Sequence, residues 1–316
     1  MRFTTTCRLA ALLTAACATL LAAGPAAAQA RWGADYFPNV ELVTHEGKTV
    51  RFYDDLLKGK SVAVNVIFTE CGDTCPLQTA KMRELQRVLG ERVGRDIFFY
   101  SISVDTQRDT PAVLKAYAQK FDIGPGWLFL TGKDENVKAV LRKLGLASGK
   151  DPASLEAHRT TMMVGNEPTG QWMKNSSLDN PRFLAATLET FLGWSAATPR
   201  PGYAQAKPIN IGNGQFVFQN ACASCHSIGG GDKVGPDLLG VTRRRPRDWL
   251  ERFILVPNEM LAAGDPVATA LFKQYKRVPM PNLGLARDEV GDILAYLDQR
   301  AAAHDTKAKT ATASRP

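Results

Sequence analysis

The stretch Cys222-Ala-Ser-Cys225-His226 decides the fold of the last third of this 316-residue chain. A C-x-x-C-H run is the attachment signature of c-type haem, because two thiols three residues apart can reach the two vinyl groups of one porphyrin. The next residue, His226, is then placed to bind the iron. The alternatives are half of a zinc site or a thioredoxin-like C-x-x-C pair. A zinc site needs two more ligands, and no other Cys or His lies within 60 residues on either side.

The surrounding residues predict a small all-α domain over residues 211–300. A short helix should run from Gly212 into the motif, a Gly-rich turn should follow it, and helices are predicted over 247–256 and 286–300. The last of these has apolar residues at helical spacing: Val290, Ile293, Leu294 and Leu297. This segment resembles class I cytochrome c. The resemblance implies one covalent haem c and a methionine as its second axial ligand.

Two methionines compete for that axial position. Met280 lies in Val278-Pro-Met-Pro-Asn, a rigid segment directly before the last helix, where the family places its ligand. Met260 precedes it in a predicted helix end. We expect Met280 to be the ligand, and Met/His ligation raises the reduction potential of a haem. The resemblance also implies that Pro236 packs beside His226.

The first 30 residues resemble an export signal. Two arginines are followed by an apolar run over 9–23 and by Ala28-Gln-Ala30, an A-x-A cleavage site. The apolar run is shorter than the ~20 residues of a membrane span. These features predict a periplasmic protein cleaved near Ala30, with membrane association only through a partner or an uncleaved signal. A lipoprotein attached through Cys17 is the alternative. Export agrees with the haem motif, since bacterial c-type haem is attached outside the cytoplasm.

The charge distribution argues against a nucleic-acid partner. The formal net charge is +8, but much of the excess lies in the first 30 residues and after Arg300. Neither half has the strong basic excess of a phosphate-binding domain. One basic cluster lies over 243–247. It is a solvated loop, a docking patch for an acidic partner, or a partner for the haem propionates.

After the signal and the haem motif have each accounted for two of the six cysteines, Cys71 and Cys75 remain. In an oxidising compartment such a pair is a disulfide, a redox couple or a soft-metal site. A structural disulfide that closes only three residues would stabilise little. The continuous apolar run 62–68 predicts a buried strand before the pair, and 76–88 predicts a helix after it. A helix N-terminus lowers the pKa of a cysteine placed there.

The remaining pattern over 31–197 predicts an α/β domain. We expect strands over 97–104 and 127–130, a hairpin of 161–164 with 171–174, and helices over 111–121, 135–144 and 181–192. Asp109-Thr110 is the predicted cap of the helix over 111–121, with Pro111 in its first turn. Strand, cysteines and helix in this order are the layout of thioredoxin-like proteins, here with C-x-x-x-C. The fold class is therefore a thioredoxin-like α/β domain followed by an all-α cytochrome c domain.

Two motifs carry a second resemblance: Cys71-Gly-Asp-Thr-Cys75-Pro76 and Ser103-Val-Asp105-Thr-Gln-Arg108-Asp109-Thr110-Pro111. With a later His158, they are similar to the Sco/SenC family of copper-binding assembly factors for the copper A centre of cytochrome c oxidase. The resemblance implies that Cys71, Cys75 and His158 bind one copper and that Asp105 lies nearby without binding it. The turn that follows the strand after His158 departs from the family pattern.

This ligand set suits copper. Thiolates select Cu(I), and imidazole accepts both Cu(I) and Cu(II). Because the metal binds thiolates, a disulfide between Cys71 and Cys75 would abolish the site.

The halves are joined by a Pro-containing linker over 198–210, and residues 301–316 are predicted to be a disordered tail. The first functional hypothesis is a periplasmic metallochaperone that delivers copper to, or redox-prepares, the copper A subunit of cytochrome c oxidase, with haem c for one-electron transfer. Other periplasmic redox or copper proteins are further candidate partners. The alternatives are a thiol–disulfide oxidoreductase, which would be an enzyme, and an electron carrier or redox sensor.

Overall fold

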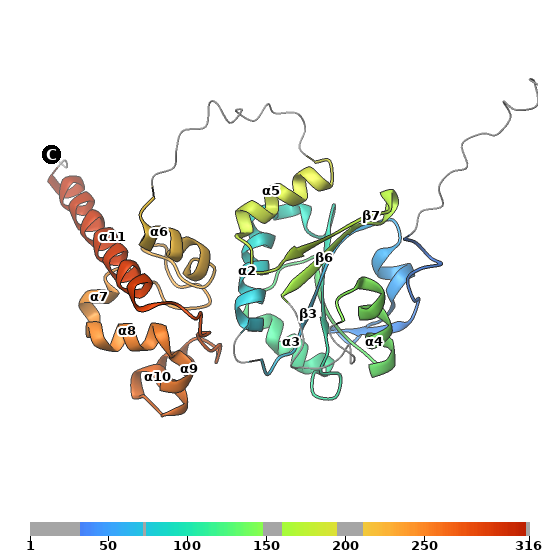
Figure 1. Ribbon diagram of the computed structural model, residues 1–316, viewed down its shortest axis with the longest axis horizontal. Helices are drawn as coiled ribbons and strands as arrows, with labels where there is room; N and C mark the ends of the chain where they lie inside the picture. The colour runs from blue at the N-terminus through green and yellow to red at the C-terminus, as the bar shows by residue number, and fades with distance from the viewer. Residues whose placement is uncertain (1–31, 72–73, 148–159, 195–210, 314–316) are drawn as a thin grey trace, which may run out of the picture.

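A mixed β-sheet forms the centre of the front half of the chain, and helices alone form the rear half (Figure 1). The computed structural model describes residues 32–71, 74–147, 160–194 and 211–313. The predicted signal, the predicted linker over 198–210 and His158 lie outside these ranges. Within them, no helix combines the length and the hydrophobicity that crossing a membrane requires.

The sheet has seven strands in the order β2-β1-β5-β4-β3-β6-β7. Strand β4 pairs in parallel with β3 and β5, and the other pairs are antiparallel. The strands are β1 (Glu41–Thr44), β2 (Thr49–Arg51), β3 (Ser61–Ile67), β4 (Phe98–Ser103), β5 (Trp127–Thr131), β6 (Thr161–Asn166) and β7 (Gln171–Ser176). Because β3 is buried on both faces, its sequence is apolar without alternation, except for the buried Asn65, which accepts a hydrogen bond from Ser101.

Helices cover both faces of this thioredoxin-like sheet. On one face, α2 (Thr74–Leu89), α3 (Pro111–Lys120) and α5 (Pro181–Phe191) share a core with the inner strands. On the other, α4 (Asp134–Leu144) and the π-helical turn η1 (Phe52–Leu57) pack over a second core. Short 3₁₀ turns lie at η2 (Gly90–Arg92) and η3 (Glu167–Thr169).

The predicted α/β fold is confirmed, and every predicted strand and helix of this half is present with ends that differ by a few residues. The hairpin of β1 and β2 was not predicted. Its strands are too short to establish a periodic pattern, and pairing of β1 with the edge of β5 holds them in place.

In the rear half, helices enclose the haem motif. They are α6 (Asn213–Val217), the π-helical turn η5 (Phe218–Cys222), α7 (Val241–Arg244), α8 (Arg247–Leu255), α9 (Pro257–Ala262), α10 (Pro266–Gln274) and α11 (Arg287–Ala313). Helix α11 crosses α6 closely. A Cβ atom at Gly214 would lie 2.0 Å from the carbonyl oxygen of Asp292, so only glycine permits this crossing. The four apolar residues predicted for the last helix are all buried.

The predicted disorder of 301–316 is wrong over residues 301–313, where α11 continues without a break. Ala301 is buried, and Asp305 forms an ion pair of 2.6 Å with Arg243. Alanine, the most frequent residue of this segment, is also the best helix former. The composition that suggested disorder is therefore compatible with a helix, because Ala301 packs in the core and Asp305 is paired with Arg243 of α7.

Candidate dithiol and haem sites

Cys71 and Cys75 lie between the end of the inner strand β3 and the first turn of α2. Cys75 is fully buried in the first turn of α2, and Cys71 is half-buried just before it. The backbone N–H of Cys75 donates to Sγ of Cys71 at 3.3 Å, and no disulfide joins the two thiols. The structure thus brings the predicted pair together, with one thiol accessible and the other enclosed.

The hydrogen bond with Cys71 raises the pKa of Cys75 far above its ordinary value, and burial raises it further. The prediction that the helix N-terminus would lower this pKa is therefore wrong for Cys75. A neighbouring thiol and a dry environment outweigh the partial charge of the helix end. The pair holds a proton at neutral pH, and a metal that binds both sulfurs must displace it.

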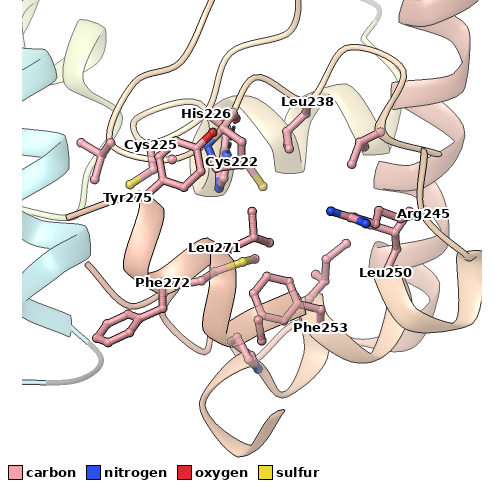
Figure 2. A pocket seen from close by; sticks show the side chains of 18 of the residues that line it. Cys222, Cys225, His226, Leu238, Arg245, Leu250, Phe253, Leu271, Phe272 and Tyr275 are labelled. Carbon is pink, nitrogen blue, oxygen red and sulfur yellow. Dashed lines mark hydrogen bonds between the residues drawn. The ribbon is translucent and has the colours of Figure 1, made fainter. Parts of the chain in front are cut away.

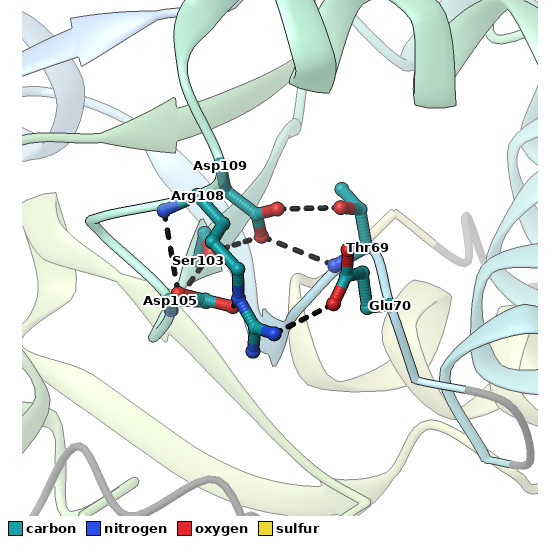
Figure 3. Close-up of polar contacts among 6 residues, drawn as sticks. All are labelled: Thr69, Glu70, Ser103, Asp105, Arg108 and Asp109. Carbon is teal, nitrogen blue, oxygen red and sulfur yellow. Dashed lines mark hydrogen bonds and ion pairs between the residues drawn. The ribbon is translucent and has the colours of Figure 1, made fainter.

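A buried carboxylate fixes the segment that leads to Cys71. Asp109 accepts hydrogen bonds from the amide of Thr69 (3.1 Å), the hydroxyl of Thr69 (2.5 Å) and the hydroxyl of Ser103 (2.5 Å), as Figure 3 shows. Asp109 and Ser103 are fully buried. The carboxylate therefore ties the end of β3 to the end of β4. The sequence suggested a cap of α3 at this position, but Thr110 alone accepts a capping bond, from Val113.

Arg108 forms a polar rim beside this network. Its guanidinium donates to Asp105 at 2.5 Å and to Glu70 at 2.6 Å (Figure 3). Glu70 directly precedes Cys71, so this bridge connects the loop after β4 to the approach to the dithiol. The side chain of Asp105 is engaged with Arg108.

The described ranges hold no group of three His, Cys, Asp or Glu side chains arranged for a metal ion. The third ligand predicted from the resemblance, His158, stays a prediction. The sheet register bears on it, because β6 is antiparallel to β3 and pairs Val64 with Met163 and Ser61 with Asn166. Strand β6 therefore begins, at Thr161, at the end of the sheet where β3 leads into Cys71. Met162 and Met163 are both buried within β6.

The haem motif follows a π-helical turn. Cys222 ends η5, and the backbone amides of Cys225 and His226 both donate to its carbonyl oxygen, at 3.1 and 3.0 Å. This tight turn lets all three side chains line one cavity (Figure 2). Burial raises the pKa of both thiols to about 12, so each is a neutral thiol at physiological pH.

His226 is held in a fixed orientation. Its Nδ1 lies 2.9 Å from the carbonyl oxygen of Pro236, which fixes a proton on Nδ1 and leaves the lone pair of Nε2 for a metal. Burial lowers the pKa of His226, which favours this neutral form. Gly235 lies against the ring, since a Cβ there would be 2.6 Å from Cε1 of His226. The expected proximity of Pro236 is therefore realised as a hydrogen bond.

The cavity suits a flat apolar cofactor. It has a volume of about 380 Å³, and its walls are mainly apolar. They include Leu250, Phe253, Leu271, Phe272, Leu294 and Leu297. Met280 is part of the lining, whereas Met260 is buried in α9 and lies outside it. Thiols, an oriented imidazole, a thioether and apolar walls together form the donor set and the environment that haem c requires.

The arginines of the basic cluster over 243–247 lie in two different environments. Arg244 and Arg245 line the cavity, and Arg245 points into it from the segment between α7 and α8 (Figure 2). Arg243 pairs with Asp305, and Arg247 pairs with Glu251 at 3.2 Å. Of the three alternatives, the geometry favours a propionate partner for the inward pair.

A carboxylate organises the loop after the motif. Asp237 accepts hydrogen bonds from the amides of Gly229 (2.8 Å) and Gly231 (2.7 Å) and from the hydroxyl of Ser227 (2.8 Å). Burial acts to raise the pKa of Asp237, but these bonds and one from the Leu239 amide outweigh it and lower the pKa to about 2. The loop that delivers Gly235 and Pro236 to His226 is therefore fixed by one charged side chain.

Comparisons with known proteins cover both halves of the chain. The family model described as SCO1/SenC matches residues 28–192, more than half of the chain, and the one described as Cytochrome c matches residues 211–301. The chain belongs to the SCO1/SenC family. Both resemblances suggested by the sequence are confirmed, and the rear half is a cytochrome c domain, which implies haem c.

Among relatives of this SCO1/SenC protein, the SCO2-like protein of Rickettsia felis is 31% identical over 147 residues, which cover 44% of this chain and 68% of the relative. Protein SenC of Rhodobacter capsulatus is 30% identical over 155 residues, 48% and 68% of the two chains. Among solved structures, Bradyrhizobium japonicum ScoI with copper bound is 27% identical, with a TM-score of 0.40 and coverage of 48% and 96%. The cytochrome c domain of the pp3183 protein from Pseudomonas putida is 44% identical, with a TM-score of 0.27 and coverage of 28% and 88%.

Proposed function

We propose that this protein is a periplasmic copper-binding assembly factor that delivers copper to, or redox-prepares, the copper A centre of cytochrome c oxidase. Copper is its cargo, bound by Cys71, Cys75 and His158. The observation that carries the proposal is the convergence of two thiols at the end of β3, one enclosed and one accessible. An accessible ligand lets an incoming protein thiol attack the metal, so cargo can be passed on.

The surroundings of the dithiol support a metal site. Asp109 fixes the backbone just before Cys71, so that less ordering is required when the metal binds. The register of β6 against β3 brings the chain that follows His158 back to the dithiol side of the sheet. A copper held by two thiolates and one imidazole has low coordination, which leaves a position open for a ligand of the acceptor.

In the rear domain, Cys222 and Cys225 would attach haem c, and His226 and Met280 would bind its iron. Haem c supplies one-electron transfer when bound. This chain's own residues orient His226 through Pro236, exclude water with the apolar walls and offer Arg245 to a propionate. Attachment of haem c requires export, and a periplasmic location agrees with the signal predicted over residues 1–30.

The test is a copper titration of the reduced, haem-loaded protein, with copper and haem measured in the same samples. We expect one copper per chain, no uptake after the thiols are oxidised to a disulfide, and much weaker uptake in His158→Ala. Cys71→Ser is the control that removes a sulfur ligand. If the reduced wild-type protein takes up no stoichiometric copper, the proposal is refuted.

A second candidate is a thiol–disulfide oxidoreductase, and the hydrogen bond between the two thiols favours it. Two thiols in contact can close to a disulfide with little movement. The candidates differ in their need for His158. If His158→Ala reduces a disulfide substrate as fast as the wild-type protein and copper uptake is negligible in both, the oxidoreductase is the better description.

A further inference from the structure

One buried cation joins the two domains. Lys81 of α2 is only 6% exposed, and it is the one Lys or Arg side chain that is buried in the part of the chain the structure describes. Its ammonium group donates to the carbonyl oxygen of Leu178 in its own domain and, at 2.7 Å, to that of Asn220 in the cytochrome domain. Asn220 lies in η5, two residues before Cys222. The charge of Lys81 is thus held at the edge of the haem motif.

The rest of the contact is small and mixed. The side-chain amide of Asn180 donates to that of Asn220 at 3.2 Å, and Lys276 donates to the carbonyl oxygen of Gln119 at 3.3 Å. Three apolar side chains of the cytochrome domain also pack against the core formed by α2, α3 and α5: Cys225, Val234 and Val278. Few polar bonds around a small apolar patch are typical of interfaces that open and close.

The contact covers the part of the cytochrome domain nearest to its redox site. Cys225 is one of the two haem-attaching thiols, and Val278 lies two residues before Met280. The ammonium group of Lys81, bonded to Asn220, therefore lies on the side of the cytochrome domain that holds the haem motif.

The partners of Lys81 leave its charge in place. Both acceptors are neutral carbonyl groups, so they hold the ammonium group without cancelling its charge. Burial lowers the pKa of Lys81, and the charge of Asp179 acts in the opposite direction. Oxidation of a haem adds one positive charge to the iron centre. In a partly dry interface two positive charges repel each other more strongly than in water. Lys81 therefore disfavours the oxidised haem as long as the domains are in contact.

We propose that the contact between the domains is a redox-sensitive docking interface, in which Lys81 makes the domains associate more tightly when the haem is reduced than when it is oxidised. The inference rests on the proposed attachment of haem at Cys222 and Cys225. It follows by reciprocity: if docking favours the reduced haem, reduction favours docking by the same factor. The balanced step is Fe(III) plus one electron to Fe(II), with the electron taken from Cu(I), which becomes Cu(II), or from an external one-electron reductant.

The first test compares Lys81→Met with Lys138→Met in the full-length, haem-loaded, copper-free protein. Lys138 lies on α4, on the opposite face of the sheet, so its variant loses the same charge away from the interface. In a redox titration followed by haem absorption, we expect Lys81→Met to shift the equilibrium about tenfold toward the oxidised haem, which is 59 mV for one electron. A shift no larger than that of Lys138→Met overturns the proposal.

The second test measures docking directly, by hydrogen exchange of the backbone amides over residues 177–188. This segment of the front domain takes part in the contact with the cytochrome domain and contains no haem ligand. In the wild-type protein these amides should exchange more slowly when the haem is reduced, and the difference should vanish in Lys81→Met. Lys81→Arg keeps the charge and should restore both the redox equilibrium and the difference. Equal exchange in the two redox states of the wild-type protein overturns the proposal.

The outcome is separable from that of the copper proposal. Failure of the wild-type protein to bind copper refutes the copper proposal and leaves the docking interface standing, because an external reductant can set the haem state. A wild-type protein without covalent haem, detected in its absorption spectrum, refutes the docking proposal and leaves copper uptake to be scored in the same samples.

Discussion

Replacement of Asp109 is the most direct way to separate the architecture of the dithiol site from its ligands. The carboxylate does not belong to the predicted ligand set, yet it accepts two hydrogen bonds from Thr69 and one from Ser103. Asp109→Ala removes all three acceptor interactions and leaves the ends of β3 and β4 without their link. We expect this variant to be less stable and to bind copper more weakly.

The magnitude follows from the burial of each donor. Ser103 is fully buried, so its hydroxyl loses an acceptor that water cannot replace, at a cost of about 1–3 kcal/mol. Thr69 is half-buried, and its two donors can partly turn to water, which adds about 1 kcal/mol. The free energy of unfolding should fall by about 2–4 kcal/mol. In Asp109→Asn the amide still accepts and donates, so the loss should be about 1 kcal/mol.

Denaturant unfolding can distinguish the two halves. Tryptophan fluorescence reports mainly on the front half, which has four of the five tryptophans: Trp32, Trp127, Trp172 and Trp194. Haem absorption reports on the rear half and serves as the internal control. Asp109→Ala should lower the fluorescence midpoint and leave the haem midpoint unchanged. Its copper affinity should fall about tenfold, or ~1.4 kcal/mol, because the backbone before Cys71 is no longer fixed.

Two results would contradict this reasoning. If Asp109→Ala unfolds within about 0.5 kcal/mol of the wild-type protein, the network does not stabilise the fold as its burial indicates. If stability falls but copper affinity is unchanged, Asp109 supports the sheet without positioning Cys71.

Three further predictions concern the cytochrome domain. Gly235→Ala places a Cβ 2.6 Å from the ring of His226 and should lower haem incorporation or shift the haem spectrum. The control is Gly230→Ala, whose Cβ has no contact under 3.4 Å and which should leave both unchanged. The lowered pKa of Asp237 contributes stability that is present above pH 3.8 and lost as the pH falls toward 2. In Asp237→Asn, the midpoint of denaturant unfolding followed by haem absorption should therefore depend less on pH in this acid range. Truncation after Arg300 removes one ion pair and one buried alanine. The free energy of unfolding measured by haem absorption should therefore fall by about 1 kcal/mol. An unchanged midpoint would show that the end of α11 does not stabilise the cytochrome domain.

The sequence predicted the features whose chemistry is local. The haem motif, the strand before Cys71 and the helix after Cys75 each depend on residues within one short segment, and the structure contains all three. Met280 was distinguished from Met260 by its place before the last helix, and it lines the cavity. These features needed no knowledge of how distant segments meet.

The role of Asp109 could not be found in this way. Its hydrogen bonds join segments 40 residues apart, and the local pattern before a helix suggested a cap. The pKa of Cys75 was misjudged for the same reason, since a helix end is visible in a sequence but burial and the exact approach of Cys71 are not. A weak signal did exist for Lys81. It lies four residues before Leu85 and next to Met82, on the buried stripe of α2, where a charge needs a partner.

Helix α2 gives the two sites a common support. Cys75 lies in the first turn of the helix, and Lys81 follows six residues later, about 9 Å along the axis at 1.5 Å per residue. This helix shares a core with the inner strands and packs against α5. We therefore expect a change in the dithiol that shifts the first turn of α2 to reach the contact between Lys81 and Asn220, and a change in docking to reach the dithiol. The cysteines and the haem motif are far apart in the sequence, but one rigid helix separates them in the fold.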